Sequence, residues 1–312
     1  MEKAASSIRF KWMVVIAFIF TISEIQFVYA QGCSDAGFCT LEAFKPNRPD
    51  SLSLDTNNLF KIGFSNGGAD HSISVIGGYL EYSRQITSIV SLQGKLTFTS
   101  QGGNGIRSSG VSDLYIISSF ELHHKTKLSL GIKTPFTDGN LKKNNLALPM
   151  DYQPSLGTVD LLFGISKEIK SLKLVFAYQQ PVIQNKNQFL SENNDPNSLL
   201  YNFQSTNKYK RSPDVLLRIS CPIKASEKFT ITPSLLPIYH LSDDRFTDLD
   251  LVERKISGSK GLTFNANIYL DYLIKQNAIL SLIVGTPFIT RKTKPDGLTR
   301  SYVASLEYSV KF

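Results

Sequence analysis

Leu306-Glu307-Tyr308-Ser309-Val310-Lys311-Phe312 closes the chain, and its apolar and polar residues alternate strictly. Successive side chains of a β-strand point to opposite faces, so one face of this stretch is apolar and the other polar. A free strand with one apolar face is an aggregation hazard in water. The same strand is stable where its apolar face meets lipid and its edges are paired within a barrel. The ending therefore predicts the closing strand of a transmembrane β-barrel.

The other end of the chain has the organisation of a secretory signal peptide over residues 1–30. Basic residues precede an eleven-residue apolar run from Trp12 to Ile22, and Val28-Tyr29-Ala30 offers a small-residue cleavage site. A helix needs about twenty apolar residues to span a bilayer, so this run is too short to be a membrane anchor. A lipoprotein signal is the alternative, because Gly32 precedes Cys33, although Ala30 and Gln31 fit a lipidation box poorly.

Composition is consistent with an all-β membrane protein. The chain has 20 Phe and 13 Tyr, residues that favour strands, and the rest of it has no apolar run long enough for a membrane helix. The formal net charge of +8 raises the question of nucleic acid binding. Lys and Arg never form a run longer than two residues, and export argues further against that partner. We expect no nucleic acid partner and place the positive charge at turns and loops near anionic lipid.

The cysteines fit an oxidising compartment. Cys33 and Cys39 enclose a small loop, for which we predict a disulfide, since no further Cys or His lies nearby to complete a metal site. This pair belongs to an irregular segment over residues 31–57. Cys221 lies within an apolar strand pattern, where it is expected to be an inert packing residue.

The remainder, residues 58–312, is predicted to form a closed antiparallel barrel of about twelve strands. Connection lengths support this, because short turns alternate with mostly longer, polar connections, as periplasmic turns and external loops do. The strands are predicted near 58–66, 71–84, 88–100, 108–124, 126–136, 155–168, 171–183, 212–225, 228–241, 259–274, 277–290 and 297–312.

Alternation within these strands assigns the polar face to the lumen. Leu92 and Leu217 are predicted to face lipid, and their neighbours Gln93 and Arg218 to face inward. The ionisable side chains predicted to line the lumen are Lys61, Glu81, Lys95, Asp113, Glu121, Lys133, Asp160, Lys173, Arg218, Asp271 and Glu307. They either pair across strands and fill the barrel, or in part line a path for a solute.

Catalytic chemistry is not indicated. His71, His123, His124 and His240 are placed apart by this topology, so neither a metal site nor a shared catalytic base is predicted, and no cofactor is expected. Outer-membrane phospholipases also have twelve strands and use a Ser–His pair. No serine segment here matches their motifs, so that enzyme class remains a minor alternative.

Two resemblances narrow the functional hypotheses. The ending with Tyr308, Val310 and Phe312 resembles the signal that outer-membrane barrels present to the barrel assembly machinery. In length, strand rhythm and terminal Phe312, the mature chain resembles transporter-like outer-membrane barrels of Gram-negative bacteria, and specifically the meta-pathway phenol-degradation family. That resemblance implies a channel for a small, hydrophobic solute, with no individual functional residue carried over. The alternative is a structural or adhesive barrel that binds partners through its external loops.

Overall fold

The computed structural model describes residues 40–46, 57–297 and 302–312. Within these residues twelve long strands alternate with turns and short 3-10 helices, and no helix is long and apolar enough to cross a membrane. The long strands are β1 (Asn58–Gly68), β2 (Ser74–Gln85), β3 (Val90–Gly103), β4 (Ile106–Leu122), β5 (Thr126–Pro135), β8 (Val159–Ile169), β9 (Leu172–Ile183), β10 (Asp214–Ser220), β12 (Phe229–His240), β15 (Gly261–Lys275), β16 (Ala278–Ile289) and β17 (Tyr302–Lys311).

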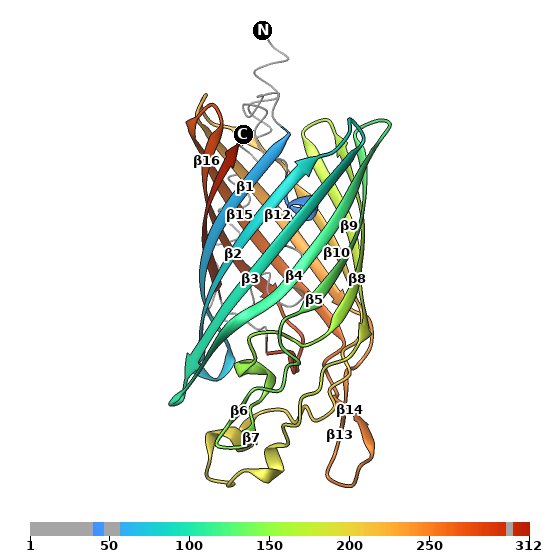
Figure 1. The fold of residues 1–312 in the computed structure, drawn as a ribbon, viewed down its shortest axis with the longest axis vertical. Helices are drawn as coiled ribbons and strands as arrows, with labels where there is room; N and C mark the ends of the chain where they lie inside the picture. The colour runs from blue at the N-terminus through green and yellow to red at the C-terminus, as the bar shows by residue number, and fades with distance from the viewer. Residues whose placement is uncertain (1–39, 47–56, 298–301) are drawn as a thin grey trace.

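The strands form one closed antiparallel barrel (Figure 1). Neighbours in sequence pair around the wall, and the last strand returns to the first, from Leu59 opposite Lys311 to Gly68 opposite Tyr302. Closure leaves no unpaired edge, which is the condition for crossing a bilayer with strands. The predicted fold class, a closed barrel of twelve strands, is confirmed.

The connections are sorted by length between the two ends of the barrel. Figure 1 shows the long ones at the end remote from the C-terminus. They carry the small elements β6 (Lys142–Lys143), β7 (Leu146–Ala147), η4 (Met150–Tyr152), η5 (Ser191–Asn193), η6 (Leu199–Asn202), β13 (Arg245–Thr247) and β14 (Glu253–Lys255). This end is the external one, because external loops of outer-membrane barrels are long and periplasmic turns are short.

Side-chain burial separates the two faces of the wall. Leu92 is 44% exposed and its neighbour Gln93 is 7% exposed; Leu217 is 40% exposed and Arg218 fully buried. The outward face carries large apolar side chains along every strand, as a lipid-facing surface does. The predicted orientation of these two residue pairs is confirmed.

Several predicted boundaries are wrong by three residues or more, among them the start of β8, which is Val159 and not residue 155. Two others have a local cause. The strand predicted from residue 71 begins only at Ser74, since η3 (Asp70–Ser72) turns the chain with His71 and Ser72 at positive φ. The strand predicted over 212–225 breaks after Ser220, and only β11 (Ile223–Lys224) continues the pairing. Pro222 stands in the gap, and a proline has no N–H to donate to a ladder. Cys221, before it, is a half-buried free cysteine.

The external loops pack on one another over the barrel mouth. We call the connections 136–158, 184–213 and 241–260 the lid. One apolar cluster joins the outer end of β2 to two lid connections, through Ile73, Val75, Leu148, Tyr152, Phe189 and Phe203. A second joins all three connections, through Met150, Leu156, Tyr209 and Ile256. The lid therefore has its own core and covers the barrel as a packed layer.

Candidate functional site

A short piece of the N-terminal segment lies inside the barrel. We call residues 40–46 the plug; its centre is the 3-10 turn η2 (Glu42–Phe44), visible within the lumen in Figure 1. Leu41 and Phe44 are 0% and 1% exposed, and η2 packs against β8. The plug is the part of the irregular segment 31–57 that fills the lumen; Cys33 and Cys39 lie outside the described residues.

Polar atoms of the plug bind one side of the lumen. The Lys45 ammonium lies 2.5 Å from a Glu307 carboxylate oxygen on β17. The Glu42 carboxylate pairs with Lys61 on β1. On β3, Lys95 donates to the Thr40 carbonyl at 3.0 Å and to its hydroxyl at 2.9 Å. These buried ion pairs hold the plug in one position, because moving either partner away would leave the other charge without compensation in a medium of low dielectric.

Apolar side chains of the plug pack against the opposite side. Leu41, Ala43 and Phe44 belong to one buried cluster with wall residues Tyr115, Ile117, Leu162, Val175, Ala177, Leu216, Leu236 and Ile238. Those wall residues come from β4, β8, β9, β10 and β12, so this part of the wall is apolar on both faces. At one point a polar group reaches the plug from this side: the Arg218 guanidinium donates to the Phe44 carbonyl at 2.8 Å.

Five of the eleven predicted lumen charges form a row of cross-strand partners, which we call the charge girdle. Lys61 on β1 lies opposite Glu81 on β2, which lies opposite Lys95 on β3. Tyr115 on β4 continues the row, and beyond it Lys133 on β5 lies opposite Asp160 on β8. The ammonium–carboxylate distances are 3.0 Å for Lys61–Glu81, 3.9 Å for Lys95–Glu81 and 2.7 Å for Lys133–Asp160. Opposite charges directly across a pair of strands stabilise the sheet, so the girdle supports the wall itself.

A cavity of about 170 Å³ separates the plug from the lid. Thr40 and Lys45 border it on the plug side, and Pro154, Ser155 and Leu156 on the lid side. The wall between contributes the aromatic rings Tyr79, Tyr115 and Tyr269. A space of this size holds several water molecules or one small organic molecule.

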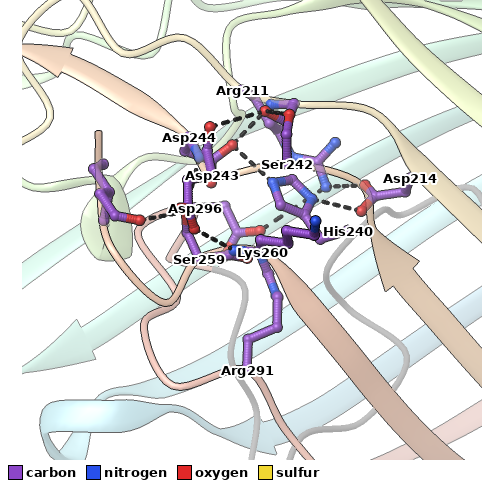
Figure 2. Close-up of polar contacts among 12 residues, drawn as sticks. Arg211, Asp214, His240, Ser242, Asp243, Asp244, Ser259, Lys260, Arg291 and Asp296 are labelled. Carbon is purple, nitrogen blue, oxygen red and sulfur yellow. Dashed lines mark hydrogen bonds and ion pairs between the residues drawn. The ribbon is translucent and has the colours of Figure 1, made fainter. Parts of the chain in front are cut away.

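At the external mouth a second buried network ties the lid to the barrel (Figure 2). His240, the last residue of β12, lies between two carboxylates: Nδ1 is 2.7 Å from Asp214 and Nε2 is 2.8 Å from Asp244. A ring with both nitrogens facing carboxylate oxygens is satisfied as the doubly protonated cation. Tyr209 donates to the other Asp244 oxygen at 2.7 Å, which joins the 184–213 connection to the same centre.

Two arginines extend this network. Arg211 pairs with Asp214 and lies 3.9 Å from Asp296, to which Arg291 donates at 2.8 Å. Burial alone would raise the pKa of Asp296, but Arg291 and Arg211 outweigh it and hold that pKa below its usual value. Likewise, burial opposes the charge of Arg211, yet its neighbours Asp214 and Asp296 raise its pKa. Three cations thus face three anions, and the network fixes the 184–213, 241–260 and 290–297 connections to one another.

The structure brings ten of the eleven predicted lumen residues to the inner side of the wall. Nine of the ten are at most 8% exposed: seven belong to the girdle or contact the plug, and the other two are Lys173 and Asp271, which accepts a 2.5 Å hydrogen bond from Ser281. The tenth, Asp113, lies beneath the lid, where it accepts a 2.6 Å hydrogen bond from Ser155. Glu121 differs. Its side chain is 43% exposed and pairs with Lys127 at 2.6 Å, because it stands at the periplasmic end of β4, where the lumen opens to water.

The chain's last residues lie beside its first strand. Tyr308 and Phe312 are 40% and 57% exposed on the outer face, and Val310 is partly buried. The Phe312 amide donates to the Asn58 carbonyl at 3.1 Å, so the ending lies at the periplasmic rim next to the start of β1.

A closed twelve-stranded barrel with an apolar outer face and a polar, ionisable interior defines an outer-membrane β-barrel protein. No protein-family model and no curated protein matches the chain. Solved structures to which it is similar include the CymD monoaromatic hydrocarbon channel, at 9% identity and a TM-score of 0.45 over 91% of this chain and 94% of that one. The KdgM porin is similar at 10% identity and 0.43 over 81% and 99%. The translocator domain of the autotransporter NalP from Neisseria meningitidis is similar at 8% and 0.43 over 84% and 91%. The lumen itself therefore has to indicate the function.

Proposed function

We propose that the protein is an outer-membrane channel for a small solute, and that the plug closes its lumen at rest. The observation that carries this is the content of the lumen. In a small barrel, wall side chains alone fill the interior, but here the wall leaves room for a separate chain segment and for a cavity of about 170 Å³. A passage blocked by a segment of seven residues opens when that segment moves.

The attachment of the plug is compatible with such movement. It has no strand pairing with the wall among the described residues, and its polar anchors are side chains at Glu42 and Lys45 and polar atoms of Thr40 and Phe44. The wall keeps the Lys61–Glu81 pair of the girdle without it. The barrel can therefore remain folded while the plug is displaced.

Planar-bilayer conductance tests this. Glu42→Ala combined with Lys45→Ala removes both charged anchors and should raise the open probability of the channel at least tenfold over the unmodified protein. Removing one partner of a buried ion pair costs about 3–5 kcal/mol, and here that cost falls on the closed state, in which the plug keeps the wall partners buried. Lys125→Ala is the matched control, because Lys125 is 73% exposed at a periplasmic turn and touches no part of the lumen. Heat-modifiable mobility on a denaturing gel confirms that each variant is folded.

A folded double variant that conducts no more than the Lys125→Ala control would contradict the proposal. The barrel would then be a filled structural one, and a role of the external loops in binding a partner would replace transport.

The export route is proposed with the function. Residues 1–30 would direct secretion, Cys33 and Cys39 would form a disulfide ahead of the plug, and Tyr308, Val310 and Phe312 would be read by the barrel assembly machinery. The outward position of Phe312 beside β1 supports the last of these.

A further inference from the structure

The Phe44 side chain occupies a place that the wall has left open for a ring. A Cβ added at Gly164 on β8 would lie 2.2 Å from Cε1 of that ring and 2.8 Å from Cζ, so only glycine admits it. The ring is 1% exposed. A glycine under an aromatic ring in the middle of a strand weakens the strand itself, so its presence serves the close approach.

Register shows what surrounds this place. Gly164 pairs with Ala177, Ala177 with Leu216, and Leu216 with Ile238, so four strands contribute one continuous apolar row. Arg218, two residues beyond Leu216 on the same face, stands in the next row and is fully buried. Its guanidinium donates to the Phe44 carbonyl at 2.8 Å and lies 5.9 Å from the Tyr269 ring. The result is an apolar pocket with a cationic donor at one edge.

We propose that this pocket is the solute site of the channel, that it takes an aromatic carboxylate, and that Phe44 occupies it at rest in place of that solute. The inference rests on the proposed function, because the solute enters only when the plug leaves. From its ring through Cβ and Cα to the carbonyl carbon, Phe44 has the skeleton of 3-phenylpropanoate. The ring of the solute would lie on Gly164, and its carboxylate would take the place of the Phe44 carbonyl at Arg218.

The chemistry favours a carboxylate over a neutral aromatic molecule. A planar guanidinium matches a carboxylate through two parallel hydrogen bonds, and a charge-assisted bond is about twice as strong as a neutral one. When the plug leaves, Arg218 loses a neutral acceptor and gains an anionic one. The charge girdle is a poorer site for an anion, since Lys61 and Lys133 each have a carboxylate partner within 3.0 Å.

Calorimetric titration of the folded, detergent-solubilised barrel tests the proposal, with 3-phenylpropanoate and its neutral analogue 3-phenylpropan-1-ol as probes. Phe44→Ala should bind the acid at least tenfold more tightly than the unmodified protein, because the competing ring is gone. Adding Arg218→Gln to Phe44→Ala should lower the affinity for the acid at least tenfold, because hydrogen bonds to charged groups are the stronger ones. The affinity for the alcohol should stay within about twofold. If Arg218 had only a structural role, its substitution would lower the affinities for both probes equally.

Two glycine variants provide a second route should Arg218→Gln not fold. In the Phe44→Ala background, Gly164→Val should abolish binding of both probes by filling the place of the ring. Gly94→Val is its control, since a Cβ at Gly94 on β3 meets no other atom within 4 Å.

Acid and alcohol bound equally by Phe44→Ala, or binding undisturbed by Gly164→Val, would overturn the solute site. The proposed channel function would still hold if plug variants raise conductance while 3-phenylpropanoate does not bind. Conversely, selective acid binding without any conductance would overturn the channel and keep the pocket.

Discussion

The two sides of the lumen solve the problem of a buried interior with opposite chemistry. On β1, β2, β3 and β17 the inner face holds the charges of Lys61, Glu81, Lys95 and Glu307, each compensated by a neighbour. Around Leu41 and Phe44 of the plug, β8, β9, β10 and β12 instead contribute aliphatic side chains that pack as a core. The first side depends on pairing and the second on the exclusion of water.

The sequence of the plug matches both the charged side and the aliphatic side of the lumen. Along Thr40-Leu41-Glu42-Ala43-Phe44-Lys45, the polar side chains reach the charged side and the apolar ones reach the aliphatic side. Loss of the plug would therefore expose two different surfaces, one that water can solvate and one that favours an apolar solute. This difference suggests that the aliphatic side, with Arg218 at its edge, is the selective surface.

The largest effect is expected from breaking the charged side. Glu81 is 1% exposed and is the girdle carboxylate between Lys61 and Lys95. Glu81→Ala should lower the free energy of unfolding by about 3–5 kcal/mol, because it leaves buried ammonium groups short of an anion. Glu121→Ala, which removes an exposed rim pair, should cost at most about 1 kcal/mol.

Urea unfolding of the barrel in lipid vesicles, followed by heat-modifiable mobility, measures both variants. Equal losses for Glu81→Ala and Glu121→Ala would mean that the charged side is open to water.

A somewhat smaller effect is expected on the aliphatic side. Leu216→Ala should lower the free energy of unfolding by about 2–3 kcal/mol through the cavity it leaves next to the plug. Its neighbour Leu217 faces lipid, whose chains are as apolar as leucine and fill the vacated space, so Leu217→Ala should cost less than about 1 kcal/mol. The same unfolding measurement compares the two. A negligible loss for Leu216→Ala would show that the aliphatic side is already wet, with no packed core.

Alternation in the sequence predicted the barrel and the lipid face because lipid requires apolar residues at every second position. It could not predict the aliphatic side of the lumen. In β9 and β10, Val175, Ala177 and Leu216 interrupt the polar face, and a pattern read as apolar outside and polar inside has no place for them. The plug could not be predicted for a related reason: its alternation of polar and apolar residues spans only residues 40–43 and breaks at Phe44, and the sequence does not show which part of the wall the segment contacts.

Part of the network at the external mouth could have been predicted from the sequence. Asp214 lies 11 residues before the end of the strand predicted over 212–225, and His240 lies 12 residues after the start of the one predicted over 228–241. The predicted hairpin therefore places them within one position of each other, and the observed register pairs them directly. Asp244, Arg291 and Asp296 could not be added, because they stand on external connections whose paths depend on packing in the lid.

The smallest predicted effect concerns the roof of the cavity on the charged side. Asp151, in η4 of the lid, lies three residues before Pro154 of that roof. Burial, with the charges of Asp70 and Asp296, raises the pKa of Asp151 to about 7. An unfolded Asp titrates near 3.9, so the contribution of Asp151 to lid stability is complete below about pH 4 and is lost as the pH rises through 7.

Protection of the external loops from hydrogen exchange, corrected for intrinsic rates, should therefore fall from pH 5 to pH 8. Asp151→Asn should flatten this dependence and leave the roof better protected at pH 8. Asp248→Asn is the control, because Arg254 lowers the pKa of exposed Asp248, which stays ionised throughout this range. Identical pH dependence in the two variants would show that Asp151 does not govern the roof.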